Sequence, residues 1–137
     1  MITSQQEEIT LISDPKNVAQ VESFVEQIAK KYSISPNLYG NILISLTEAV
    51  TNAITHGNCN DCNKMVAIRL ERQGKQLAFI VSDQGEGFDF ENLPDPTTPD
   101  NLLRIGGRGV FLMRQLADRI IYHDDGRTVE MVFSTQP

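Results

Sequence analysis

The stretch from Pro36 to Asn58 contains a single side chain that is charged at neutral pH, Glu48. Ser35-Pro36 is a typical helix start and Gly57-Asn58 a typical stop, so this stretch is predicted to form one helix that ends at His56. Because a solvated helix needs a charged face, a helix with so little charge is expected to be covered by protein over most of its circumference. The rest of the chain must supply that cover.

The remaining sequence predicts short strands around three helices. Apolar residues recur at helical spacing after the start signal Asp14-Pro15, which indicates a first helix that runs to about residue 32. Alternation predicts strands at 8–12, 65–72, 76–82, 119–123 and 128–134. A third helix is expected at 109–117, and the segment 83–109, rich in Gly and Pro, is too long for a plain connection and is expected to be functional or disordered.

This order of elements indicates an α/β (α+β) fold. The strands 65–72 and 76–82 are joined by a short turn at Gly74, and Asp125-Gly126 is a hairpin signal between the last two strands. Such connections predict a mixed, mostly antiparallel sheet with the helices on one face, a two-layer sandwich. The length suits one domain over residues 1–137.

The composition limits the possible partners. A net charge of -6 argues against non-specific nucleic-acid binding, which requires Lys and Arg to neutralise phosphates. No apolar run approaches the roughly 20 residues of a membrane span, and the first residues lack the basic and apolar regions of a secretory signal. We therefore expect a cytoplasmic protein without direct contact to membrane or nucleic acid.

The predicted helix carries a polar stripe around Glu48. Asn41, Ser45, Glu48 and Asn52 recur at spacings of three and four, followed by Thr55 or His56. An unpaired carboxylate in apolar surroundings requires a partner, and a ligand or a metal ion can be that partner. Asn52 lies one turn further on, and its amide oxygen is a suitable ligand for Mg²⁺. The alternative is an ordinary helix with a solvated polar stripe, in which His56 is satisfied by carbonyl groups at the helix end.

Two glycine clusters flank the long segment. Asp83 follows a predicted strand directly, so its carboxylate could accept a hydrogen bond from an amine such as that of adenine, and Gly85 and Gly87 permit a close approach of the backbone. Many ordinary turns have the same pattern.

The second cluster, Gly106-Gly107-Arg108-Gly109, precedes a helix, where backbone amides and Arg108 suit a triphosphate and the glycines permit a mobile lid. A flexible hinge without ligand is the alternative. Neither the P-loop motif nor the dinucleotide-binding motif of a Rossmann fold occurs in the chain.

Cys59 and Cys62 form a CxxC pair after the predicted helix. A redox pair and part of a zinc site are the functional interpretations, but structural zinc takes four ligands and a thioredoxin-like motif opens a helix. We interpret the segment as a solvated loop that holds two thiols, with no assigned role.

Three motifs in sequence order carry a family resemblance: Glu48 to Ala53 (EAVTNA), Asp83 to Phe88 (DQGEGF) and Gly106 to Gly109 (GGRG). They resemble the N, G1 and G2 boxes of the gyrase, histidine kinase and MutL (GHKL) ATPase superfamily. The resemblance implies a histidine-kinase-like ATPase domain with the Bergerat fold that uses ATP and Mg²⁺.

Within this superfamily, LTEAVTNAITHGN and GGRGVFLMRQLAD are similar to the stand-alone serine kinases that act as anti-sigma factors. The resemblance implies that Glu48 is the general base, that Asn52 holds Mg²⁺ and that Asp83 reads the adenine amine. The remaining nucleotide-binding residues that it implies are Gly85, Gly87, Phe88, Gly106, Gly107, Arg108, Gly109, Val110 and Thr128. It also implies a homodimer that binds a sigma factor and phosphorylates a serine of an anti-anti-sigma (STAS-domain) partner.

Two other functions remain open at this point. The catalytic domain of a histidine kinase would need a helical hairpin with the phospho-accepting His, for which the chain leaves no room, although a partner chain could supply it. A regulatory module could bind ATP without catalysis, in which case Glu48 would have no role in transfer.

Overall fold

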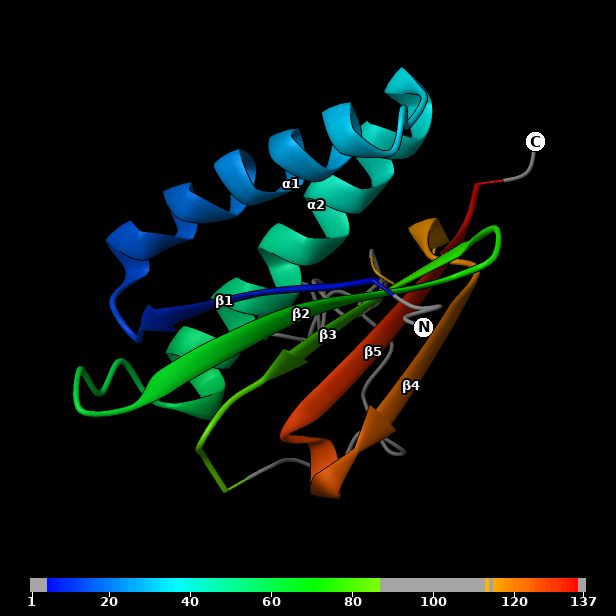
Figure 1. Cartoon of the computed structure of the whole chain (residues 1–137). Helices are drawn as coiled ribbons and strands as arrows, with labels where there is room; N and C mark the ends of the chain where they lie inside the picture. The colour runs from blue at the N-terminus through cyan, green and yellow to red at the C-terminus, as the bar shows by residue number, and fades with distance from the viewer. Residues whose placement is uncertain (1–4, 87–112, 114, 136–137) are drawn as a thin grey trace, which may run out of the picture.

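The computed structural model describes residues 5–86, 113 and 115–135, which form a five-stranded sheet covered on one face by two helices (Figure 1). The predicted two-layer fold is confirmed. In chain order the elements are β1 (Gln5–Ile12), the 3-10 turn η1 (Pro15–Val18), α1 (Ala19–Lys31), α2 (Pro36–Asn52), the π-helix η2 (Ala53–Gly57), β2 (Met65–Gln73), β3 (Gln76–Ser82), β4 (Arg119–His123), the 3-10 turn η4 (Asp124–Gly126) and β5 (Thr128–Ser134).

The sheet has the strand order β1-β2-β3-β5-β4, and every pairing among the described strands is antiparallel. The turn between β2 and β3 is as short as predicted, with Gly74 at a φ of 59°. The hairpin predicted around Asp125-Gly126 is confirmed, since β4 and β5 are antiparallel neighbours. Because His123 pairs with Thr128, four residues form the connection, and the first three of them make the 3-10 turn η4.

Both predicted helix starts are present. The side chain of Asp14 accepts a hydrogen bond from Lys16 N, and that of Ser35 accepts one from Leu38 N. After Asp14 the chain first makes the 3-10 turn η1, closed by the bond from Asn17 N to Asp14 O, and so α1 begins four residues later than the start signal suggested.

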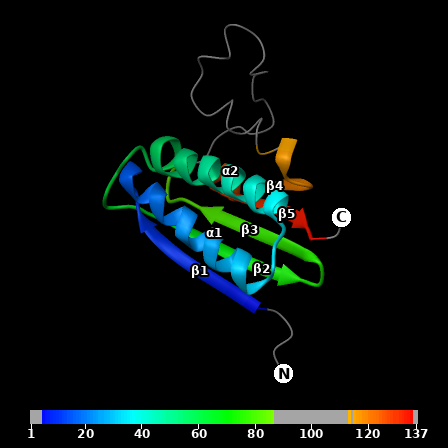
Figure 2. The ribbon, with the colours of Figure 1, turned by 90° about the horizontal axis from the view of Figure 1, so that it is seen from above.

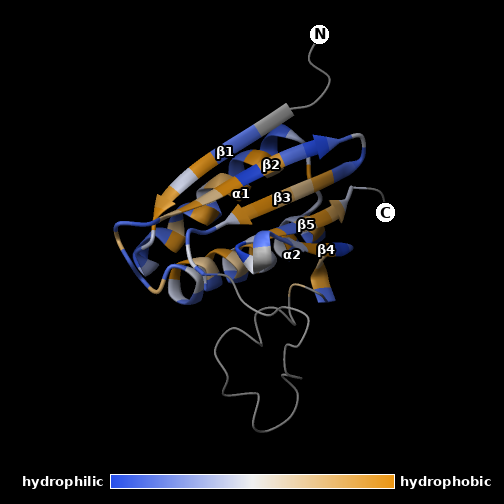
Figure 3. Ribbon diagram, turned by 90° about the horizontal axis from the view of Figure 1, so that it is seen from below, coloured by the Kyte–Doolittle hydropathy of each residue, from blue (hydrophilic) through white to orange (hydrophobic). Residues whose placement is uncertain are grey.

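The core lies between the helices and the sheet. Figure 2 shows α1 and α2 side by side over the strands, with α2 towards β3 and β5. Phe79 on β3 and Phe133 on β5 meet edge to face at its centre, with ring centroids 6.1 Å apart. The inward residues of the strands are buried and alternate with more polar ones, as the interleaved colours of Figure 3 show. The helices bury Val21, Phe24, Val25, Ile28, Ile42, Leu46, Ala49 and Val50.

The long helix differs from its prediction at one end. The α-helical part stops at Asn52, and residues Ala53–Gly57 continue as a π-helix in which Asn58 N donates to Ala53 O. A π-turn holds one residue more than an α-turn, so side chains beyond Asn52 leave the three-and-four spacing of the polar stripe. Helical periodicity alone therefore could not place Thr55 and His56.

Candidate nucleotide site

Glu48 and Asn52 lie on α2 one turn apart, and both are half-buried. Among the described residues, none gives the Glu48 carboxylate or the Asn52 amide a hydrogen bond or an ion pair. Their neighbours Ala49 and Val50 are buried in the core, which fixes the helix face from which Glu48 projects. A half-buried carboxylate and amide without partners in this part of the chain fit a site that receives a ligand.

The rest of the predicted stripe behaves differently. Ser45 is fully buried, and its hydroxyl finds no partner among the described residues. Thr55 donates its hydroxyl to Thr51 O at 2.7 Å, so it is satisfied within the helix. His56 is exposed, and partial desolvation lowers the pKa of its imidazole. The stripe that could face a ligand therefore ends at Asn52.

Asp83 follows the end of β3 in a loop that is held to other elements by hydrogen bonds of its backbone and of the Gln84 side chain. Its own N–H donates to Arg127 O at 2.9 Å, and Gln84 N donates to Asn58 Oδ1 at 2.7 Å. The carbonyl of Gly85 accepts from Arg127 Nε at 2.7 Å. Asp83 Oδ1 in turn accepts from Gly85 N at 2.8 Å, which closes the loop on itself. The strand-end carboxylate thus has a fixed backbone, as the sequence predicted.

The backbone at Gly57 lies directly against this loop. A Cβ on Gly85 would lie 1.8 Å from Gly57 O, and a Cβ on Gly57 would lie 2.4 Å from Asp83 Oδ2. A side chain does not fit at Gly85, because its Cβ would overlap the backbone of Gly57, and one at Gly57 would fit only if the Asp83 side chain moved. The end of the π-helix that follows Asn52 is therefore packed on the Asp83 carboxylate.

The electrostatics of Asp83 fit a site for an amine. Burial raises the pKa of its carboxyl group above the ordinary value of 3.8, and the hydrogen bond from Gly85 N and the positive charges of Arg127 and Lys64 oppose this increase. Oδ1 is used by Gly85, so the second oxygen, beside Gly57, is the one that remains for a ligand. An exocyclic amine would supply a hydrogen bond that compensates part of the desolvation.

Thr128 lies at the same end of the sheet. It pairs with Ser82, the residue before Asp83, and the two hydroxyl oxygens are 3.1 Å apart. The structure thus brings together Glu48 and Asn52 on one helix, and Asp83, Gly85 and Thr128 at the ends of β3 and β5. The other predicted site residues lie outside the described residues: Gly87, Phe88, Gly106, Gly107, Arg108, Gly109 and Val110.

Two residues at this site were not singled out from the sequence. Asn58 was interpreted only as part of a helix stop, and Arg127 was not discussed. A buried amide beyond a helix end resembles any other stop signal in sequence, and nothing local distinguishes Arg127 from a turn arginine. Their contacts join segments 26 and 42 residues apart, so only the folded chain reveals them.

The residues fit the Mg²⁺ that the fold family implies. Mg²⁺ keeps several waters and commonly takes only one or two protein ligands together with phosphate oxygens, so the single half-buried amide of Asn52 is a sufficient donor. No group of three His, Cys, Asp or Glu side chains suited to a metal occurs in the described part of the chain.

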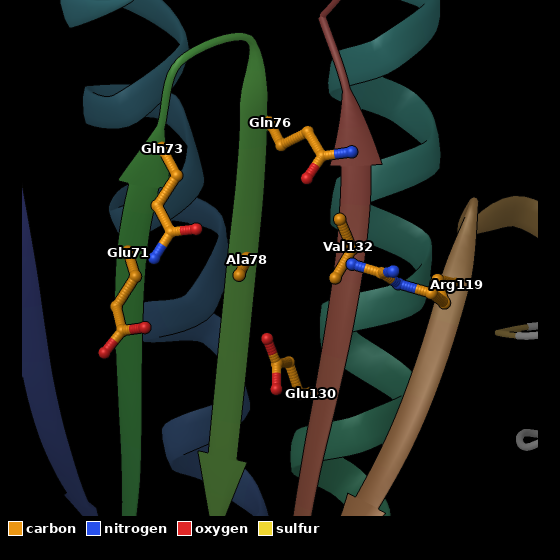
Figure 4. Close-up of a pocket in the computed structure, with 7 residues that line it drawn as sticks. All are labelled: Glu71, Gln73, Gln76, Ala78, Arg119, Glu130 and Val132. Carbon is orange, nitrogen blue, oxygen red and sulfur yellow. The ribbon is translucent and has the colours of Figure 1, made fainter.

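Two further features lie apart from this site. A shallow hollow on the face of the sheet opposite the helices is lined by polar side chains together with Ala78 and Val132 (Figure 4). Cys59 and Cys62 are exposed free thiols in the loop between η2 and β2. Within the described residues, no helix is both long and apolar enough to cross a bilayer.

The fold and the site together define an α/β nucleotide-binding domain. The histidine kinase-like ATPase domain family matches residues 11–133, and the chain belongs to this family. It is similar to the serine-protein kinase RsbW of Bacillus subtilis, with 30% identity over 131 residues that cover 90% of this chain and 82% of the relative. With RsbW of Staphylococcus epidermidis the identity is 35% over 97 residues, which cover 65% of this chain and 61% of the relative.

A solved structure supports the fold. The crystal structure of the RsbU and RsbW domains of a Mycobacterium tuberculosis protein aligns with a TM-score of 0.64 at 17% identity. The alignment covers 95% of this chain and 32% of that one. The predicted family and fold are thereby confirmed.

Proposed function

We propose that this chain is an ATP-dependent serine-protein kinase that also acts as an anti-sigma factor. The observation that carries the proposal is the half-buried Glu48 without a partner in the described chain, one turn from Asn52. A site for nucleotide binding alone would need an adenine reader and phosphate ligands, and it would have no use for a half-buried, unpartnered carboxylate one turn from the metal ligand.

Each residue has a distinct role in this proposal. Asp83 accepts a hydrogen bond from the adenine amine, and Thr128 supports the same end of the site through Ser82. Asn52 would hold Mg²⁺, which supplies positive charge against the phosphate oxygens when bound. Glu48 accepts the proton of the substrate serine as the serine oxygen attacks the terminal phosphorus of ATP, while the bond from that phosphorus to the bridging oxygen breaks and ADP leaves. The cluster at 106–110 would close on the phosphates.

The partners follow from the resemblance and from the names of the relatives. We propose that the protein substrate is an anti-anti-sigma (STAS-domain) protein and that the chain sequesters a sigma factor in the cytoplasm. We also propose a homodimer, in which a second copy covers part of the sheet face opposite the helices. Ile12 and Met65 are cross-strand neighbours there and are among the exposed large apolar residues. Sedimentation equilibrium measures this association directly.

The decisive experiment uses the substitution Glu48→Gln. The purified protein is incubated with Mg-ATP and the anti-anti-sigma-type proteins of the same genome, and serine phosphorylation is followed by mass spectrometry. We expect Glu48→Gln to lower the transfer rate by about 10²- to 10⁴-fold, since a general base contributes that much, with ATP affinity intact. The carboxylate-to-amide change keeps the size of the side chain.

Glu26→Gln on α1 is the matched control, because Glu26 is exposed and remote from α2's polar stripe. It should transfer phosphate at the rate of the unmodified protein. Unchanged transfer in Glu48→Gln would remove Glu48 from the mechanism. ATP binding without transfer to any candidate protein would contradict the kinase and leave a regulatory module.

A further inference from the structure

Asn58 is a fully buried polar residue with contacts to three separate parts of the chain. Its Oδ1 accepts from Gln84 N at 2.7 Å, while its Nδ2 donates to Ser13 Oγ at 2.6 Å and to Met65 O at 3.0 Å. These partners lie just beyond β1, at the start of β2 and in the loop after β3. A buried amide that satisfies partners on three elements fixes their relative positions, because each lost bond leaves a desolvated group.

The same residue also ends the helix that carries the metal ligand. Asn58 N donates to Ala53 O and so closes the last turn of η2, which directly follows Asn52. Its backbone therefore belongs to the helix side of the site and its side chain to the Asp83 side. Gln84, which follows Asp83 in the loop after β3, has a second hydrogen bond to the start of β2, because its Oε1 accepts from Met65 N at 2.8 Å.

We propose that Asn58 is a positioning residue that fixes the Asp83 carboxylate relative to the helix of Asn52 and thereby sets the preference for adenine. The proposal rests on the proposed nucleotide site. Asn58 touches no nucleotide and acts through Gln84 and Asp83. Its effect is on base selection because a carboxylate accepts from the adenine amine but repels the carbonyl oxygen that guanine carries at the same place, and this distinction requires a fixed carboxylate.

The test measures dissociation constants for ATP and GTP by calorimetry, without any protein substrate. In Asn58→Ala, Gln84 N loses its acceptor, and we expect ATP to bind about tenfold more weakly, the cost of about one buried hydrogen bond, with GTP affinity little changed. The ratio of the two constants should therefore fall about tenfold. If Asn58 only stabilised the fold, Asn58→Ala would lower the melting temperature and the fraction of active sites, but the ratio of the ATP and GTP dissociation constants would not change.

Two variants separate positioning from stability. Asn58→Asp keeps the acceptor for Gln84 N and loses the Nδ2 group that donates to Met65 O and Ser13 Oγ, so it should melt lower and still retain the ATP preference. Ser13→Ala removes only the hydroxyl that accepts from Asn58 Nδ2, so this variant should also melt lower and retain the ATP preference. Loss of the preference in Asn58→Asp, or its full retention in Asn58→Ala, would overturn the proposal.

A further variant covers the case in which Asn58→Ala does not fold. Gln84→Pro removes the same donor from an exposed position, and Gln84→Ala serves as its control because it retains the N–H. We expect the ATP preference to fall in the proline variant only, and equal ratios in the two would refute the proposal. Failure of the unmodified protein to bind ATP would instead refute the nucleotide site itself, and normal binding without transfer would refute only the kinase.

Discussion

Asp83 shows at the scale of a residue how a ligand site costs stability. Its carboxylate is partly desolvated, and burial raises the pKa more than the nearby positive charges of Arg127 and Lys64 lower it. The charged form of the carboxylate is therefore unfavourable in the protein without ligand, and a hydrogen bond from an incoming amine would stabilise it. Functional sites commonly contain such perturbed groups, and this one coincides with the position at which the sequence motif predicted the adenine reader.

Asp83→Asn should stabilise the protein without ligand at pH 7. The folded pKa is raised, so between 3.8 and that higher value the folded state binds more protons than the unfolded chain, and stability falls as the pH rises through this window. Above the window the cost is constant, and below 3.8 it vanishes because both states are protonated. Asparagine keeps an oxygen for Gly85 N and carries no charge.

Thermal unfolding between pH 3 and pH 8 measures this effect. We expect the variant to have the higher melting temperature at neutral pH, with the difference lost in acid, and to bind ATP far more weakly. A variant that is less stable than the unmodified protein at pH 7 would contradict the electrostatic account.

At the scale of elements, the π-helix η2 and the loop after β3 form a contact in which backbone packs on backbone. A methyl group on Gly85 would overlap the backbone of Gly57, and one on Gly57 would displace the Asp83 carboxylate. Packing of this kind brings the helix of Asn52 and the strand end of Asp83 into one site. It also explains why a π-turn is tolerated at the end of α2, since the contact with the loop and the bonds of Asn58 replace regular α-helical bonds.

Alanine at these two glycines should have different effects. In Gly85→Ala the new Cβ meets the backbone of Gly57, which cannot yield, so we expect a loss of about 1–3 kcal/mol in unfolding free energy. In Gly57→Ala the Cβ meets the end of the Asp83 side chain, which can turn away, so stability should change little while ATP affinity falls. Chemical denaturation and calorimetry measure the two quantities.

Gly40 in α2 provides the control. No atom lies within 4 Å of a Cβ at this position, so Gly40→Ala should stabilise the helix by about 0.5–1 kcal/mol with ATP binding unchanged. Equal destabilisation by all three substitutions would show that the close approach at Gly57 and Gly85 is not what limits the site.

At the scale of the whole molecule, residues from α2, the end of β3, and the β4–β5 connection form one site over a single core. A ligand that contacts several segments stabilises the whole folded chain, because it binds only when all of these segments are in their folded positions. We therefore expect nucleotide binding to raise the stability of the whole domain.

Mg-ATP at about 100 times its dissociation constant should add about 2.7 kcal/mol to the stability, a rise of about 10 °C in melting temperature for a chain of this size. Removal of Mg²⁺ with EDTA should reduce the shift, and in Asn52→Ala the shift should no longer depend on Mg²⁺. Differential scanning fluorimetry measures all of these. The same shift with and without Mg²⁺ in the unmodified protein would contradict the role of Asn52.

Much of the fold could be predicted from the sequence because it depends on local signals. Asp14-Pro15 and Ser35-Pro36 mark helix starts, alternation marks the strands, and the bounds of β3, β4 and β5 agree with their predictions. The departures lie where distant contacts decide the backbone. The last turn of the long helix is a π-turn whose end, at Gly57 and Asn58, contacts the Asp83 loop, and periodicity contains no information about that loop.

Glu48 remains the feature that the sequence by itself determined: one carboxylate on an otherwise uncharged helix, one turn from an amide, beside motifs that predict a nucleotide. The spacing of charged and polar residues is a local property of the chain and is readable without coordinates, whereas burial depends on the fold. Only the tertiary structure decided how that helix meets Asp83, because this depends on a glycine contact and on hydrogen bonds of Asn58 and Arg127 across segments far apart in sequence. Such contacts exist only after the core has formed and brought those segments together.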